Sequence, residues 1–284
     1  MSGSPDFELL TSLRYDPQLC TIRDDTLARC HAEVSIEPNS PFYVLELHKD
    51  RLLAAAAYFK ERSSSWSSVP DPLEWSTMMT DALSMIEDMQ NSGGPQRPLK
   101  IRILCTPAGI HKVDVSATPP VSLETLYPSF NFMEAPERPG RSASVAWMVR
   151  LDTKPTAPSD YTMFKTTSRD MYDEARKRAG IVSFAVQEEV LLYNHNNEIM
   201  EGSLTTVYFY RDGHWCTPPE SSGGLPGTTR RLDNPDLSIQ QRLTLVSDVV
   251  DGEVVWLSNG VRGFFPGQIN LCKRSPLEPK TDES

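Results

Sequence analysis

Residues 200–230 contain the stretch that decides the fold, and they read MEGSLTTVYFYRDGHWCTPPESSGGLPGTTR. The β-prone run Leu204–Tyr210 and the shorter run His214–Thr217 flank Asp212-Gly213, a pair typical of a tight hairpin. The glycine-rich residues 222–230 follow, and their glycines allow the backbone to approach a ligand closely. Free N–H groups where a helix begins suit a phosphate, and we predict a helix near Thr228. The stretch therefore predicts an antiparallel sheet that leads into an anion-binding loop.

The sequence on both sides of this stretch extends the prediction to a strand-rich second domain over residues 161–270. Glu201-Gly202-Ser203 opens the strand that runs to Tyr210, and Gly180 is a natural end for a preceding amphipathic helix. A polar tail is expected over residues 271–284. The other elements predicted here are a helix at Ser168–Ala179, strands at Ile181–Val186, Val190–Tyr193 and Glu253–Ser258 (the last strand), and a turn at His195-Asn196-Asn197.

Residues 1–150 predict a smaller α+β domain, joined to the second domain by a linker over residues 151–160 that is rich in proline and threonine. The fold class expected for the whole chain is therefore α+β (mixed α/β), in two domains. Two Ser/Pro-rich stretches, Ser63–Pro72 and Pro136–Ser144, are interpreted as lids or as disordered insertions. The elements predicted in this half are strands at Phe7–Tyr15, Phe42–Leu47 and Leu99–Thr106 and helices at Arg51–Lys60 and Trp75–Met89.

Composition excludes several classes of function. The 284 residues include 38 acids and 28 bases, for a net charge of −10, and no dense basic cluster suggests binding to nucleic acid. No apolar window reaches the roughly 20 residues of a membrane span, and the polar start does not resemble a secretory signal. Five widely spaced cysteines favour reduced thiols in the cytoplasm, and no metal-binding or P-loop motif occurs. We expect a cytoplasmic protein whose partner is a small anionic molecule.

Lys165 and Glu201 are the first candidates for chemistry. Lys165 follows Met163 and Phe164, and a lysine in apolar surroundings loses hydration, which lowers its pKa and frees the amine as nucleophile and base. A carboxylate such as Glu201 can hold a proton on a pyridine nitrogen, so that the ring absorbs electrons. Taken singly, each residue also fits a solvated surface position. Their combination with the glycine-rich loop is the informative feature.

The order of these features resembles the class IV aminotransferase family of pyridoxal-phosphate enzymes, the fold type IV group. Within that family the chain is most similar to the fungal-type aminodeoxychorismate lyases, over roughly residues 7 to 269. The resemblance implies the two-domain architecture of the D-amino acid aminotransferase-like enzymes. It is carried by residues 7–16, 48–52, 165–169, 200–203, 217–230 and 258–263.

The resemblance implies a role for each matching residue. Lys165 would hold pyridoxal 5'-phosphate covalently and act as the catalytic base, and Glu201 would bind the pyridine nitrogen. Arg51 would bind the cofactor phosphate together with Thr228 and Thr229. The resemblance also implies a homodimer.

The reaction implied is the elimination of pyruvate from 4-amino-4-deoxychorismate, which gives p-aminobenzoate for folate biosynthesis. Because that substrate is a dicarboxylate, Arg14, Arg169 and Arg262 are candidates for binding it, although each fits a structural arginine equally well. Two alternatives stay open. One is a class IV aminotransferase acting on a branched-chain amino acid, a D-amino acid or an amine; the other is a non-catalytic relative that binds the cofactor.

Two positions depart from the family pattern. Aminotransferases of the family often have a tyrosine where this chain has Asp170, which favours the lyase. Members that bind phosphate often have serine or threonine at the position of Gly260, so help from that loop would have to come from Ser258 or from the backbone.

Overall fold

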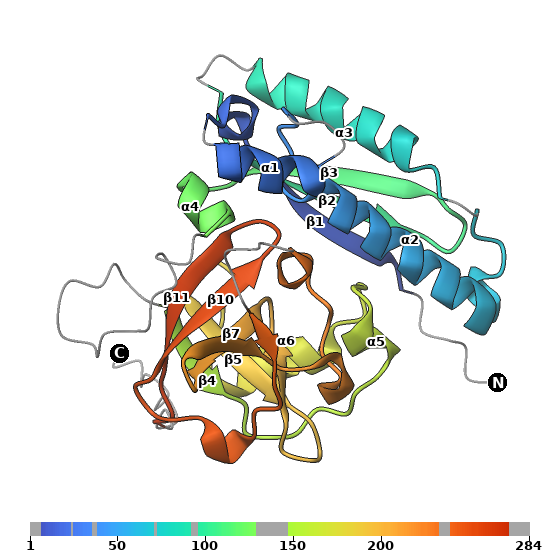
Figure 1. Ribbon diagram of the computed structural model, residues 1–284. Coiled ribbons are helices and arrows are strands. Elements are labelled where there is room, and N and C mark those ends of the chain that lie inside the picture. Colours follow the sequence, from blue (N-terminus) through green and yellow to red (C-terminus); the bar gives the residue numbers. More distant parts are fainter. Residues whose placement is uncertain are drawn as a thin grey trace, which may run out of the picture.

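The computed structural model describes residues 7–23, 25–35, 39–70, 73–91, 96–128, 147–232 and 239–272. Two sheets organise this part of the chain, one small and one large (Figure 1). The loop predicted at Pro136–Ser144 and most of the predicted tail lie outside the described residues. Of the tail, the structure describes only Leu271 and Cys272, and both are exposed. No helix in the described ranges has the length and apolar character needed to cross a membrane.

The smaller sheet is antiparallel and has the order β1-β2-β3, formed by β1 (Leu9–Tyr15), β2 (Leu99–Cys105) and β3 (His111–Ala117). Side chains alternate along a strand, so one face of β2 carries buried Leu99, Ile101 and Ile103 while the other carries Lys100 and Arg102. The apolar face forms a core with two helices, α2 (Leu45–Arg62) and α3 (Trp75–Gln90). The second face of the sheet is therefore left for the other half of the molecule.

The larger sheet has the order β6-β5-β4-β11-β10-β7-β8-β9. Strand β4 runs parallel to both of its neighbours, whereas β10, β11 and β7 pair antiparallel. One core contains Val149, Ile199, Val207 and Leu257 from distant positions in this order, so the sheet curls around its own interior (Figure 1). The strands are β4 (Trp147–Leu151), β5 (Glu188–Tyr193), β6 (Ile199–Gly202), β7 (Thr206–Arg211), β8 (His214–Thr217), β9 (Gln240–Gln241), β10 (Val254–Asn259) and β11 (Gly263–Ile269).

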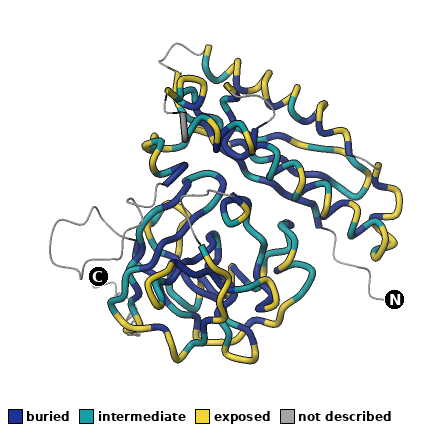
Figure 2. Tube along the Cα trace, in the orientation of Figure 1, coloured by how far each residue is buried: buried dark blue, intermediate teal, exposed yellow. Residues whose placement is uncertain are grey.

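The two halves pack directly on each other. Tyr43 and Tyr127 from the first half share a buried cluster with Tyr208, Trp256 and Phe264 from the second. Buried segments accordingly run along both sheets, while the outward side of α3 is exposed (Figure 2). The remaining helices are α1 (Asp25–Glu33), α4 (Leu123–Leu126), α5 (Asp160–Met163) and α6 (Asp170–Arg178).

Most predicted elements of the first half are present, with one error and one loop that is better packed than expected. Phe42–Leu47 is not a strand, because Val44 takes a left-handed conformation (φ 48°) and α2 begins at Leu45. The Ser/Pro-rich stretch that begins at Ser63 contains fully buried Trp66, whose ring packs in the core with the helices. The part of this loop that the structure describes is therefore fixed by apolar burial and is not a lid.

The second half corrects the predicted boundaries. Strand β4 ends at Leu151 within the larger sheet, so the change from one half to the other precedes residue 147 instead of beginning at 151. Residues 181–187 form no strand, and Val182 is 93% exposed there. The predicted strand from Leu204 begins at Thr206, and Glu201 belongs to the preceding strand β6, which ends at Gly202. Strand β11 follows the strand that was predicted to be the last.

The helix predicted near Thr228 is also shorter than expected. It is one 3-10 turn, Thr229–Arg231. The loop-like geometry keeps Thr228 and Thr229 buried beside the larger sheet, so both residues remain part of the same predicted anion-binding loop.

Candidate active site

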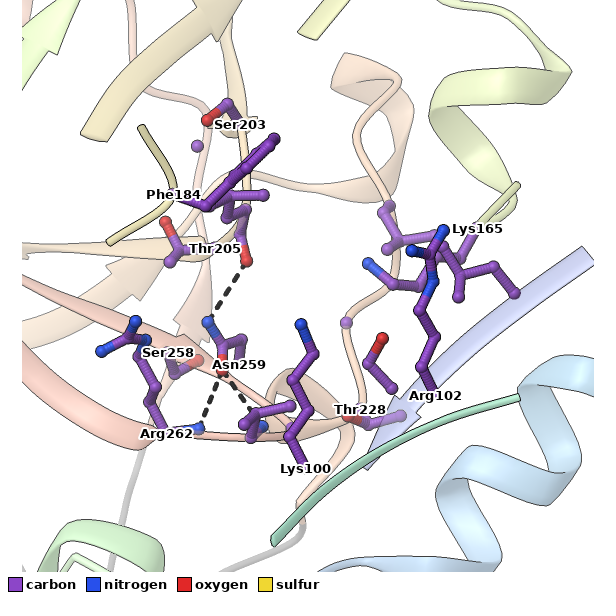
Figure 3. A pocket seen from close by; sticks show the side chains of 18 of the residues that line it. Lys100, Arg102, Lys165, Phe184, Ser203, Thr205, Thr228, Ser258, Asn259 and Arg262 are labelled. Carbon is purple, nitrogen blue, oxygen red and sulfur yellow. Dashed lines mark hydrogen bonds between the residues drawn. The ribbon is translucent and has the colours of Figure 1, made fainter. Parts of the chain in front are cut away.

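A cavity of about 660 Å³ lies between the polar face of the smaller sheet and the larger sheet. Figure 3 shows side chains that reach into it from β2, from the segment after α5 and from the loop after β10. Its lining includes Lys165, Glu201, Arg51 and the pair Thr228 and Thr229. The structure thus brings together all five residues that the resemblance assigns to the cofactor.

Lys165 is held by the first strand of the smaller sheet. Its carbonyl accepts a hydrogen bond from the Leu10 N–H at 2.9 Å, and the neighbouring Thr166 forms an isolated bridge with Leu9. Burial lowers the pKa of the Lys165 amine well below its usual value, and the nearby cations Arg169 and Arg51 lower it further. The neutral amine that a nucleophile or base requires is therefore favoured.

Glu201 lies at the end of β6 and is fixed through one oxygen. Its Oε1 accepts hydrogen bonds from the Tyr172 hydroxyl at 2.7 Å and from the Leu225 N–H at 3.0 Å, which leaves Oε2 available to a group in the cavity. Burial raises the pKa of this carboxyl group to about 7, although the Tyr172 hydrogen bond, the Leu225 hydrogen bond and Lys165 all oppose the rise. Glu201 can therefore share or hold a proton near neutral pH.

Arg51 and Thr228 form an end of the cavity that suits an anion. The Arg51 guanidinium lines the cavity from α2, and burial lowers its pKa to about 10. Its Nε and the Thr228 hydroxyl oxygen are buried and make no hydrogen bond within the described residues. Such unsatisfied polar atoms are costly, and an anion with several acceptor oxygens would satisfy them.

Thr229 and Ser258 also line the cavity, and their hydroxyl groups contact each other. The two hydroxyl groups lie 2.7 Å apart, and Ser258 also contacts the Tyr208 hydroxyl at 2.9 Å. Gly260 completes the wall, because a Cβ atom added there would lie only 2.5 Å from the His48 ring. The glycine that departs from the family pattern is therefore required by packing, and it brings the loop backbone close to Thr228.

Of the three arginines predicted to bind substrate, two line the cavity and one does not. Arg169 lies over the Tyr172 ring and donates to the Ser203 carbonyl at 2.8 Å, and Arg262 lies over the Trp147 ring. Arg14 is fully buried away from the cavity lining. The prediction for Arg14 is wrong, because its guanidinium already pairs with a carboxylate and two carbonyls. These partners are Asp16 at 2.7 Å and Pro119 and Val261 at 3.1 Å.

Sequence reasoning missed Lys100 and Arg102, two cations that line the cavity from β2. The Arg102 Nε is buried and makes no hydrogen bond within the described residues. The signal was the alternation of Leu99, Ile101 and Ile103 with these two cations, which predicts a strand with one apolar and one cationic face. The strand was predicted, but its second face was not connected to the site.

Two further observations bear on the chemistry. Asp170 is exposed in the first turn of α6 and is absent from the cavity lining, where Tyr172 contacts Glu201. No cluster of three or more histidines, cysteines or acids in the described ranges is arranged to hold a metal ion. The groups that the cavity offers thus include the Lys165 amine, one carboxylate of raised pKa, several guanidinium groups and the ammonium group of Lys100.

Comparisons with known proteins agree with this geometry. Residues 33–268 match the family described as Amino-transferase class IV. The chain is 34% identical over 141 residues to a Schizosaccharomyces pombe protein named "Putative aminodeoxychorismate lyase", covering 47% of this chain and 61% of that one. It is 26% identical over 264 residues to the aminodeoxychorismate lyase of Saccharomyces cerevisiae, covering 80% and 67% of the two chains. The chain thus spans about two thirds of the length of these relatives.

The fold is also that of a solved aminotransferase. A hypothetical aminotransferase from Mycobacterium tuberculosis, solved in a PLP-bound form, superposes with a TM-score of 0.58 at 15% identity. The superposition covers 96% of this chain and 84% of the other. At this identity the likeness establishes the shared architecture alone.

Proposed function

Because the chain belongs to the class IV aminotransferase family, we propose that it is an aminodeoxychorismate lyase that uses pyridoxal phosphate. The reaction would split 4-amino-4-deoxychorismate into p-aminobenzoate, a folate precursor, and pyruvate. The names of the two fungal relatives support this substrate. The observation that carries the proposal is the convergence of Lys165, Glu201 and Arg51 on one cavity.

The residues of the cavity fit the cofactor. The unsatisfied Arg51 Nε and Thr228 hydroxyl suit a phosphate, and Glu201 Oε2 suits a protonated pyridine nitrogen. Lys165 offers the amine that can bond to the cofactor aldehyde. Bound pyridoxal phosphate would supply an electron sink that stabilises negative charge on the carbon bearing the substrate amine.

Lys165 would be the base of the reaction. Burial lowers the pKa of Lys165 and so favours the neutral form of Nζ, which would take a proton from the amine-bearing carbon of the substrate. Glu201, held in place by Tyr172 and Leu225, would keep the pyridine nitrogen protonated meanwhile. The products together contain all the atoms of the substrate, so the chemistry needs neither water nor an oxidant.

Cationic side chains would bind the two carboxylates of the substrate. Arg169 lines the cavity from the start of α6, Arg262 lines it from the turn between β10 and β11, and Lys100 and Arg102 line it from β2. Guanidinium groups pair well with carboxylates, and partial burial strengthens the pairing. A class IV aminotransferase is the second candidate, because it would use the same lysine, glutamate and phosphate site. The exposed Asp170, in place of a tyrosine, favours the lyase.

We also propose that the protein acts in the cytoplasm as a homodimer. The five widely spaced cysteines support a reducing compartment, and the family resemblance supports the dimer. A sedimentation measurement tests the assembly. A monomer over the working concentration range would contradict the dimer and leave the proposed reaction unaffected.

The test of the reaction compares wild type with Lys165→Ala, with Lys154→Ala as the control because that lysine is exposed and outside the cavity lining. Each protein receives pyridoxal phosphate and enzymatically generated aminodeoxychorismate, and p-aminobenzoate and pyruvate are quantified together. The proposal predicts equal amounts of both products from wild type and the control, and a loss of about 10³-fold or more for Lys165→Ala. Amination of the cofactor without either product would instead establish the aminotransferase.

A further inference from the structure

The Arg51 guanidinium is a partly buried cation with a buried Nε, and its hydrogen-bond partners among the described residues are neutral groups. Its NH2 nitrogen donates to the Thr11 hydroxyl oxygen at 3.1 Å and lies 3.4 Å from His48 Nδ1. The ion pairs found among the described residues do not include Arg51; the adjacent Asp50 pairs with Arg231 instead. A partly buried charge of this kind needs its orientation fixed by neighbouring side chains if it is to face an anion in the cavity.

The directions of the hydrogen bonds behind Arg51 follow from which atoms can donate. A guanidinium only donates, so the Thr11 oxygen accepts from Arg51. The same hydroxyl lies 2.8 Å from His48 Nδ1, and the Arg51 NH2 nitrogen, which can only donate, lies 3.4 Å from the same Nδ1. An unprotonated Nδ1 can accept from both groups, so we assign it as the acceptor. Burial lowers the pKa of His48 well below its usual value, so the ring is neutral and its single proton sits on Nε2.

We propose that Thr11 and His48 are positioning residues that hold Arg51 for the cofactor phosphate, with His48 fixed in the Nε2–H tautomer. This inference rests on the proposed binding of the phosphate by Arg51. Thr11 lies on β1 and His48 and Arg51 lie one turn apart on α2, so the contact ties the helix to the smaller sheet at the point where the guanidinium enters the cavity.

The His48 ring also limits the opposite side of the phosphate site. A Cβ atom at Gly260 would lie 2.5 Å from His48 Nε2 and 2.9 Å from the Thr228 hydroxyl oxygen. The imidazole thus lies directly against the loop backbone. The His48 side chain therefore contacts the Thr11 hydroxyl through Nδ1 and faces the Gly260 loop with Nε2.

The test compares two ligands that differ only in the phosphate. Apo-protein is titrated with pyridoxal phosphate and with pyridoxal, and each dissociation constant is measured from the absorbance of the bound aldehyde. The variants are Thr11→Val, which removes the hydroxyl at nearly constant shape, and Thr11→Ser, which restores it. Thr217→Val is the matched control, because Thr217 is a buried threonine whose hydroxyl donates to the Val207 carbonyl at 3.0 Å outside the cavity lining.

The preference for pyridoxal phosphate over pyridoxal should fall about tenfold in Thr11→Val, with pyridoxal affinity unchanged. Thr11→Ser and Thr217→Val should keep the wild-type preference. An unchanged preference in Thr11→Val, or an equal loss for both ligands, would overturn the positioning role. A wild type without any preference would instead overturn the assignment of Arg51 to the phosphate.

A second measurement decides the matter if Thr11→Val does not fold. Nitrogen-15 NMR of the wild-type apo-protein distinguishes the two neutral tautomers of histidine. We expect His48 to show a protonated Nε2 and an unprotonated Nδ1 near neutral pH. A protonated Nδ1 would contradict the direction of the hydrogen bonds and with it the inference.

Discussion

The two walls of the cavity are built differently. The N-terminal wall, defined as Arg51, Lys100 and Arg102, places cations on a helix and on the polar face of a strand. The C-terminal wall, defined as Lys165, Glu201, Thr228 and Thr229, places its groups in loops and at strand ends. Burial lowers the pKa of Lys165, which favours the neutral amine, and raises the pKa of Glu201 to about 7. This difference supports our proposal that proton transfer belongs to the C-terminal wall and that anion binding belongs mainly to the N-terminal wall.

The largest effect on activity is expected from the substitution Glu201→Gln in the C-terminal wall. Glutamine preserves the shape and can still accept from Tyr172 and Leu225, but it cannot keep a pyridine nitrogen protonated. We expect kcat to fall about 10²- to 10³-fold with little change in KM. Steady-state kinetics check this, with the exposed Glu174→Gln as control. A change confined to KM would break the comparison, because it would make Glu201 a binding residue.

The same substitution should change how stability depends on pH. The folded pKa of Glu201 is raised from 4.5 to about 7, so the native apo-protein binds a proton that the unfolded chain releases between these values. The free energy of unfolding of wild type therefore falls as pH rises through that window. Relative to wild type, Glu201→Gln should gain up to about 3 kcal/mol between pH 4.5 and pH 8. Urea denaturation at both pH values measures this; a constant difference would mean that Glu201 is ionised throughout.

The substitution Arg102→Met tests the N-terminal wall. Its buried Nε lacks a partner among the described residues, and a substrate carboxylate would supply one. We expect KM for aminodeoxychorismate to rise about tenfold while kcat changes little. Arg97→Met is the matched control, since Arg97 is exposed just before the same strand. If kcat falls instead and KM is unchanged, the division between the walls is wrong.

The smallest effect is expected from Thr228→Val, which sharpens the comparison by testing the binding part of the C-terminal wall. Loss of one hydroxyl donor to the phosphate should weaken pyridoxal phosphate binding about fivefold and leave kcat unchanged at saturating cofactor. Titration of the apo-protein measures the affinity, again beside Thr217→Val. Unchanged affinity would show that the unsatisfied hydroxyl serves something other than the phosphate.

The sequence predicted the C-terminal wall better than the N-terminal wall, and the reason is local order. Lys165, Glu201 and Thr228 lie in short segments whose combination resembles the family, so the resemblance could assign a role to each of them. Lys100 and Arg102 belong to a strand whose polar face acquires a function only when the larger sheet packs opposite it. Arg14 shows the converse error, because the partners that satisfy its charge include carbonyls more than 100 residues away.

Errors in the fold also come from long-range packing. Phe42 and Val44 are β-prone, yet Phe42 packs in the core of the first half, Val44 packs in the cluster shared by the two halves in a left-handed conformation, and α2 begins directly after it. Residues 181–187 are mostly apolar, but Phe184 lines the cavity and Val182 is exposed, so hydrophobic content there does not indicate a strand. Strand β11 was missed because it contains Gly263, Pro266 and Gly267, and glycine and proline are uncommon inside strands.

The most direct test of the central claim is to locate the lysine that holds the cofactor. Protein incubated with pyridoxal phosphate is reduced with borohydride, digested and analysed by mass spectrometry, which requires no turnover. We expect the phosphopyridoxyl group on the peptide that contains Lys165, in stoichiometric amount, and its loss in Lys165→Ala. A label on Lys100, the other lysine of the cavity lining, or no label at all would contradict it.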